Sequence, residues 1–172
     1  MPVIERAQIP RGSFLKRYED EGGYADCYVA QLPGHVSQAA FVAAFYTTGL
    51  FRLERWILSV FAKRPSSDDE AAELARGERE RFAAWQVEQR SGNQLLLRDF
   101  SGRTRSWLMT EPVDAGAASS GTLLRFGSAV VSRTDPATGE HSLGPAFRAL
   151  LGFHKLYSRQ LLRAACARLR TH

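Results

Sequence analysis

Cysteine and histidine are scarce in this chain, and neither type forms a cluster. Cys27 and Cys166 are the only two cysteines, and neither belongs to a CxxC pair. A disulfide framework or a zinc site is therefore not expected, and we predict no metal and no cofactor. None of the four histidines lies at metal-ligand spacing from another: His35, His141, His154 and His172.

Long apolar runs and nucleotide-binding motifs are also missing. No stretch approaches the roughly 18 consecutive apolar residues that indicate a transmembrane helix. Glu5, Arg6 and Arg11 interrupt the start of the chain, which therefore does not resemble a signal peptide, and we expect a cytoplasmic protein. No GxGxxG, P-loop or HExxH motif occurs, which disfavours the familiar kinds of nucleotide-dependent catalysis.

Acidic residues are absent from residues 145–172. This segment has six basic residues, whereas the other 144 residues have 17 basic and 18 acidic ones. The net charge of +5 is therefore a property of one segment. Its basic residues form either a solvated helix face or a surface for nucleic acid or an anionic membrane.

The same segment has the clearest periodicity in the sequence. Residues 145–170 have apolar side chains at steps of three and four, which predicts one amphipathic helix of about 39 Å. Pro145 suits the first helical turn, and Arg168 and Arg170 complement the negative end of the helix dipole. The predicted stripe consists of Phe147, Leu150, Leu151, His154, Tyr157, Leu161, Ala165 and Leu169.

The remaining chain separates into helical and strand-like parts. Residues 24–32 alternate as a strand does, and helices are predicted after Ser37, over residues 50–63, and after the capping box of Ser67 and Glu70. From residue 82 to 133 the period changes to two, with Gly-containing turns at hairpin spacing.

This order predicts an α+β fold. An antiparallel sheet carries the long C-terminal helix across it, and extra helices are inserted after the first strand. Residues 1–22 are predicted as an N-terminal arm, and residues 23–172 as a single domain.

This pattern resembles the START-like (SRPBCC, helix-grip) superfamily of polyketide cyclases and lipid-transfer domains. The run GFHKLYSRQLL at residues 152–162, preceded by the β-branched run at 129–131, also resembles the ending of an uncharacterised bacterial family. The resemblance covers residues 24–170 by pattern and residues 122–165 by motif. It implies a cavity between sheet and helix for a small apolar or amphipathic molecule.

Strand parity nominates the residues of such a site. The odd-numbered positions combine two tryptophans with a few charges, the mixture typical of an apolar pocket with orienting polar groups. The alternative is a structural ion pair of Asp99 with an arginine, and tryptophans in the core. The predicted ligand-binding residues are Trp85, Arg105, Trp107, Arg125, His154 and Tyr157.

His154 is the most informative single position, because it lies on the apolar stripe and should face the sheet. It is either an acid–base or ligand-binding group, with Asp99 or Arg105 as its partner, or a satisfied buried histidine. The first case allows an enzyme of the cyclase or isomerase type. Phe153 and Leu156 lie off the stripe, where either the arm covers them or a second copy forms a homodimer.

Overall fold

The computed structural model describes residues 2–53, 66–114, 120–134, 141–142 and 145–170. Seven strands form one antiparallel sheet in the order β1-β2-β7-β6-β5-β4-β3, and two short strands form a separate hairpin. The pairing of β2 with β7 joins segments about 100 residues apart, with Asp26 opposite Ser128. The strands are β1 (Glu5–Arg6), β2 (Tyr24–Pro33), β3 (Arg81–Phe82), β4 (Trp85–Arg90), β5 (Gln94–Asp99), β6 (Thr104–Asp114), β7 (Ser120–Val130), β8 (Arg133–Thr134) and β9 (His141–Ser142).

Side-chain caps begin two of the helices. Ser37 accepts a hydrogen bond from the backbone N–H of Ala40, and Ser67 and Glu70 form the predicted capping box. Gly77, with a φ of 82°, ends α4 in the left-handed region that favours glycine. The helices are α1 (Lys16–Asp20), α2 (Gln38–Tyr46), α4 (Asp68–Arg76) and α5 (Pro145–Leu169), and residues 49–53 are also helical.

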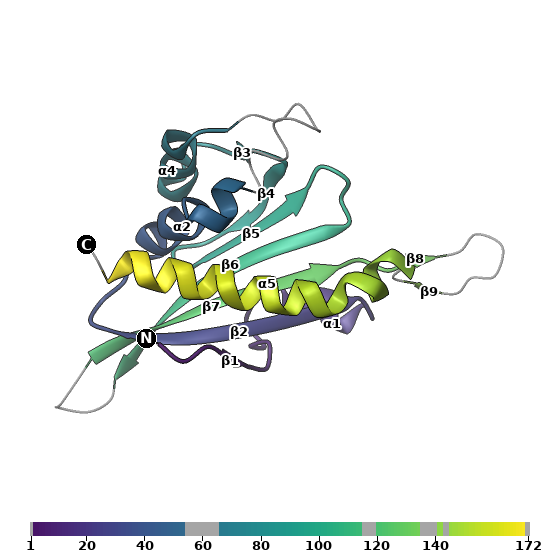
Figure 1. The fold of residues 1–172 in the computed structure, drawn as a ribbon, viewed down its shortest axis with the longest axis horizontal. Helices are drawn as coiled ribbons and strands as arrows, with labels where there is room; N and C mark the ends of the chain where they lie inside the picture. The colour runs from purple at the N-terminus through teal and green to yellow at the C-terminus, as the bar shows by residue number, and fades with distance from the viewer. Residues whose placement is uncertain (1, 54–65, 115–119, 135–140, 143–144, 171–172) are drawn as a thin grey trace.

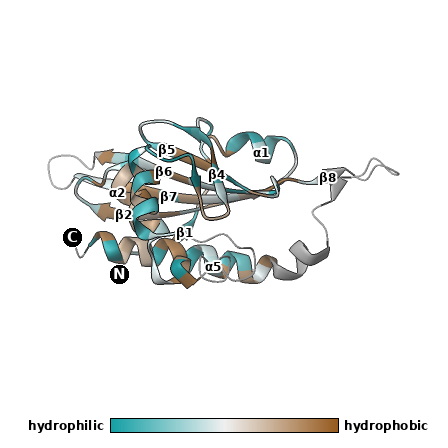
Figure 2. Cartoon of the chain, turned by 90° about the horizontal axis from the view of Figure 1, so that it is seen from above, coloured by the Kyte–Doolittle hydropathy of each residue, from teal (hydrophilic) through white to brown (hydrophobic). Residues whose placement is uncertain are grey.

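Helices cover both faces of the sheet. α5 lies across β2 and β7 on the face that also receives α2, whereas α1 lies on the opposite face (Figures 1 and 2). Gly127 permits the approach of α1, because a Cβ at this position would lie 2.6 Å from Leu15 Cδ2 and 2.9 Å from Trp107 Cε3. On the other face, Leu161 and Leu162 of α5 join the larger core.

The predicted fold class is confirmed: an antiparallel sheet carries a long C-terminal helix across it, with further helices after β2. The predicted separation of residues 1–22 as an arm differs from the structure. β1 pairs with β2, and Leu15 and Tyr18 are buried in the core beneath the sheet. Of the helix predicted over residues 50–63, positions 54–63 lie outside the described residues.

The described part of the chain has no helix that is both long enough and apolar enough to cross a membrane. The two cysteines are free and buried, Cys27 in the core on the α1 face and Cys166 in the core on the α5 face. Burial raises the pKa of each thiol to about 11. Thiolate is therefore scarce at neutral pH, and both residues act as small apolar side chains.

Candidate functional site

Four polar side chains meet where α5 crosses β2 and β7. The Ser128 hydroxyl donates to Asp26 Oδ1 at 2.7 Å, and the Tyr24 hydroxyl donates to Asp26 Oδ2 at 2.8 Å. Ser128 Oγ also lies 2.7 Å from Nε2 of His154. We call Tyr24, Asp26, Ser128 and His154 the seam cluster, because they occupy the seam between sheet and helix.

Strand alternation and strand register bring the seam cluster together. Tyr24 and Asp26 are two residues apart on β2, so their side chains project from the same face. Ser128 is the direct partner of Asp26 across the antiparallel pair, and its backbone N–H also donates to Asp26 Oδ1 at 3.3 Å. α5 then places His154 over this pair, with Nε2 3.7 Å from Asp26 Oδ2.

The hydrogen bonds define where the imidazole proton lies. Asp26 is buried, with its side chain 0% exposed, and its carboxylate receives the single hydroxyl proton of Ser128. The remaining bond of Ser128 Oγ must therefore be accepted from His154, which requires a proton on Nε2. The arrangement runs from histidine to serine to carboxylate, so Ser128 donates toward the acid and is not activated as a nucleophile by His154.

The surroundings shift the titration of the two partly exposed members. Burial lowers the pKa of His154 below its ordinary value of 6.5, and the charge of Lys155 acts in the same direction, whereas Asp26 opposes them. Burial, followed by the negative charge of Asp26, raises the pKa of Tyr24 well above its usual range. At neutral pH both side chains are therefore uncharged hydrogen-bonding groups beside a buried carboxylate.

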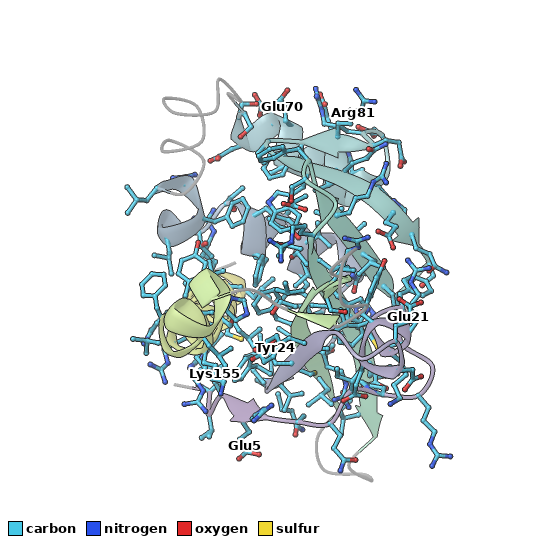
Figure 3. The ribbon with its side chains drawn as sticks, turned by 90° about the vertical axis from the view of Figure 1, so that its right-hand side faces the viewer. Glu5, Glu21, Tyr24, Glu70, Arg81 and Lys155 are labelled. Atoms are coloured by element: carbon cyan, nitrogen blue, oxygen red, sulfur yellow. The ribbon has the colours of Figure 1, made fainter. Side chains whose placement is uncertain are left out.

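Two cations of α5 flank the seam cluster. Lys155 follows His154 directly, and the Arg159 guanidinium lies 5.5 Å from the ring centroid of Tyr28, the next inward residue of β2. Burial and Asp26 raise the pKa of Tyr28, whereas the positive charges of Arg159 and Arg6 lower it. Figure 3 shows Lys155 on α5 and Tyr24 close to it in this view. The rim of the seam is therefore positively charged.

A buried hydroxyl adjoins this region on α5. Ser158 lies one helical turn after His154 and is 1% exposed. In the part of the chain that the structure describes, its Oγ has no hydrogen-bond partner. An unsatisfied buried hydroxyl costs about 1–3 kcal/mol, so a polar group bound here would gain a ready partner.

The residues predicted from odd-numbered parity do not form one site. Arg105, Trp107 and Arg125 lie on the α1 face, opposite His154. Arg105 donates to the Tyr18 hydroxyl at 2.9 Å, Trp107 donates to Gln94 Oε1 at 3.0 Å, and Arg125 pairs with the carboxylate of Glu111. These three side chains have partners within the fold.

The other predicted residues lie elsewhere. Asp99 accepts hydrogen bonds from the backbone N–H groups of Arg103 and Thr104, at 2.9 and 3.0 Å, and closes the β5–β6 turn. Trp85 packs against the larger core from β4, three strands away from β7. Tyr157 also packs against that core. The pairing of His154 with Asp99 or Arg105 is therefore wrong, because its acidic neighbour is Asp26.

Odd-numbered residues change from one face of the sheet to the other at the β5–β6 turn. Leu95 of β5 pairs with Leu108 of β6, so odd positions of β5 share a face with even positions of β6. Four residues, an even number, connect the two strands, so each odd-numbered residue of β5 pairs with an even-numbered residue of β6. Residues with odd numbers therefore lie on opposite faces of the sheet in the two strands. The grouping of all odd positions on one face is therefore wrong.

Comparison of the chain with protein-family models, with curated proteins and with solved structures finds no significant match. The resemblance to START-like proteins therefore stays a prediction. The described residues contain no group of three or more His, Cys, Asp or Glu side chains that could hold a metal ion. The assignment of the candidate site therefore depends on its geometry alone.

Four members of the site were missed from the sequence: Tyr24, Asp26, Ser128 and Ser158. A signal for Asp26 was present, since it shares its strand parity with the apolar residues Tyr28 and Ala30 and so had to be buried. The pairing of β2 with β7 could not be predicted from the sequence, because both segments are ordinary alternating strands. Pairing between segments that lie far apart in the chain leaves no local motif.

Proposed function

We propose that the protein binds a small amphipathic carboxylate at the seam between α5 and the β2–β7 pair. The polar end of the ligand lies at His154 and Ser158, and the charge is attracted by Lys155 and Arg159. The observation that supports this proposal is a polar cluster in an otherwise apolar interface. Such clusters cost stability compared with apolar packing, and they are retained most often where a site needs them.

The charge balance supports an anionic ligand over a cationic one. α5 contains no acidic residue, and the one carboxylate of the seam, Asp26, is already engaged by Tyr24 and Ser128. A ligand cation would face the rim charges of Lys155 and Arg159 without a free acidic partner. A ligand carboxylate is attracted by both.

Packing along α5 supports a ligand position near the first half of the helix. In the second half, Leu161, Leu162, Ala165 and Cys166 are fully buried against the core. In the first half, Leu151, His154 and Tyr157 are only partly buried. An apolar ligand tail would therefore remove more apolar surface from water beside the first half of the helix than beside the second half.

Decanoate is the probe that tests the proposal, and isothermal titration calorimetry measures its binding. The double charge reversal Lys155→Glu/Arg159→Glu should weaken decanoate binding by about a hundredfold, since two attractive charges become repulsive. Arg163→Glu is the matched control, because Arg163 lies on the helix side opposite His154 and should leave the affinity unchanged. Ser158→Ala should weaken binding severalfold.

Three results would contradict the proposal. One is the absence of saturable decanoate binding. Another is equal loss of affinity in the Arg163→Glu control. A third is tighter binding of decylamine than of decanoate, because it would reverse the charge preference on which the proposal depends.

A second candidate is an acid–base enzyme of the cyclase or isomerase type, with His154 as the exchanging group. The serine-mediated link from His154 to the buried Asp26 favours it, because such a link defines the imidazole tautomer. With 2-oxodecanoate in D₂O, NMR should then show exchange of the C3 protons that is lost in His154→Gln. Equal exchange in both proteins would exclude this function for His154.

Localisation, oligomeric state and other binding partners also stay predictions. The cytoplasm suits a protein whose two thiols are both unpaired. Phe153 and Leu156 are 66% and 57% exposed, and a homodimer through them stays a prediction, as does binding of nucleic acid or an anionic membrane by the basic residues of α5.

A further inference from the structure

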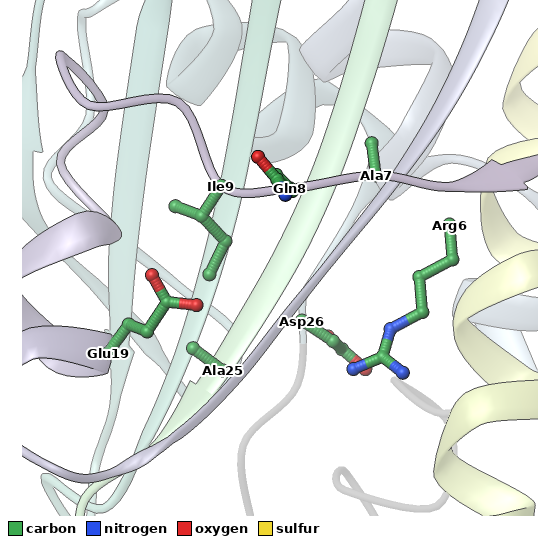
Figure 4. A pocket seen from close by; sticks show the side chains of 7 residues that line it. All are labelled: Arg6, Ala7, Gln8, Ile9, Glu19, Ala25 and Asp26. Atoms are coloured by element: carbon green, nitrogen blue, oxygen red, sulfur yellow. The ribbon is translucent and has the colours of Figure 1, made fainter.

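A pocket of about 320 Å³ lies at the outer edge of β2, where the N-terminal segment leaves the sheet (Figure 4). β1 pairs Arg6 with Tyr28, and the Ala7 N–H then donates to the Cys27 carbonyl at 2.9 Å. The chain next turns toward the α1 face, where Ile9 is buried. We call this space the strand-edge pocket.

The strand edge inside the pocket offers backbone hydrogen-bonding groups. In an antiparallel strand, every second residue directs its N–H and C=O to the same edge, so Ala25 faces outward as Cys27 does. In the described part of the chain, no backbone hydrogen bond joins Ala25 to Ile9, its next partner in register. A bound molecule with an extended amide backbone could therefore continue the ladder at Ala25.

Opposite charges lie at the two ends of the pocket. Figure 4 shows Glu19 at one end and Arg6 at the other, with Ala25 and Asp26 between them. The Asp26 carboxylate is buried and already receives the hydroxyl groups of Tyr24 and Ser128. Arg6 is exposed and has no ion pair among the described residues. At the other end, Lys16 is shared by Glu19 at 2.5 Å and Asp20 at 2.9 Å, which leaves a net negative charge.

We propose that the strand-edge pocket binds the zwitterion of a short peptide. The peptide's carboxylate pairs with Arg6, its ammonium group pairs with Glu19, and its amide groups hydrogen-bond to Ala25. The volume is at the lower end of the roughly 300–1,000 Å³ range of small-molecule pockets, which suits a dipeptide. The strand-edge pocket shares Asp26 with the seam cluster, but the proposed contacts are made by Arg6, Glu19 and Ala25, which do not belong to that cluster.

Titration of the ¹⁵N-labelled protein with alanyl-alanine tests the inference by NMR. Alanyl-alanine should shift the amide signals of Gln8 and Ala25 in a saturable way. Blocking either terminus of the probe removes one charge-assisted contact. N-acetyl-alanyl-alanine and alanyl-alanine amide should therefore each bind about tenfold more weakly.

Two variants assign each terminus of the peptide. Arg6→Gln should abolish the preference for the free carboxylate over the amide, and Glu19→Gln should abolish the preference for the free amine over the acetylated form. Arg11→Gln and Glu21→Gln are matched controls, because both residues are exposed and lie outside the pocket. These controls should keep both preferences.

The inference is overturned if alanyl-alanine causes no saturable shift, or if capping both termini leaves its affinity unchanged. A loss confined to the amide probe would also overturn it, because the pocket would then recognise an anion and not a zwitterion. Decanoate binding at the seam is tested with Lys155 and Arg159 variants, so a failure of either proposal can be recognised separately.

Discussion

Two carboxylates, the partly buried Glu88 on the α1 face and the buried Asp26 on the α5 face, have contrasting partners. Glu88 pairs with Arg17 and with Arg105, whose Nε lies 2.7 Å from Glu88 Oε2, and it accepts from the Tyr18 hydroxyl. Asp26 receives hydroxyl and backbone N–H donors, and among the described residues its basic partner within 4 Å is His154.

The difference distinguishes a structural ion pair from a candidate site. Arginines keep their charge at all accessible pH values, so Glu88 is permanently neutralised and ties α1 to β4 and β6. The partners of Asp26 are neutral near pH 7, and His154 is 24% exposed. The charge of the Asp26 cluster can therefore respond to a ligand or to pH.

Loss of Arg105 is expected to have the largest effect on stability. Arg105→Met leaves the partly buried Glu88 with Arg17 alone, whose side chain is 47% exposed, and should lower the free energy of unfolding by about 3 kcal/mol. Urea denaturation measures it. The matched control is Arg98→Met, because Arg98 lies directly opposite Arg105 on β5 but is exposed. Its cost should stay below about 0.5 kcal/mol. Equal losses in the two variants would show that Glu88 needs no arginine.

Removal of the Asp26 charge should have a smaller effect on stability. Asp26→Asn keeps the shape but weakens the bonds from Tyr24 and Ser128, at an expected cost of about 2 kcal/mol in the free energy of unfolding. The pKa of His154 should fall further, since the Asp26 charge holds it up. NMR titration of the imidazole checks the direction, and a rise in this pKa would contradict the proposed contact.

The smallest effect concerns the pH dependence of stability. The folded-state pKa of His154 lies below its unfolded value of 6.5. The unfolded chain therefore binds the proton more readily, and the contribution of His154 is present above pH 6.5 and lost as the pH falls toward the folded-state pKa. In His154→Gln, the free energy of unfolding should change less between pH 7 and pH 5, and an unchanged slope would contradict this.

A charge variant of α5 tests one cause of the lowered pKa of His154. Lys155→Gln should raise the pKa of His154, because the Lys155 charge lowers it. Arg163→Gln, on the opposite side of α5, should leave it unchanged.

Local chemistry was sufficient to predict the long helix, the capped helices and the hairpins, but not β1 and α1 within residues 1–22. The capping box of Ser67 and Glu70, the Gly-containing hairpins and the amphipathic pattern of residues 145–170 all indicate structure within one element or between neighbours in sequence. Each of them is found in the structure. The sheet-facing position of His154 followed from the same helical period.

The partners of each buried polar group were decided only by the tertiary structure. The sequence by itself determined an antiparallel sheet under a long basic helix, because helix and strand periods are local properties of the chain. Tertiary pairing joined Asp26 to Ser128 across 102 residues, and it moved Arg105 to the opposite face. Register depends on loop lengths and long-range packing, and a change of one residue in register exchanges the two faces of a strand.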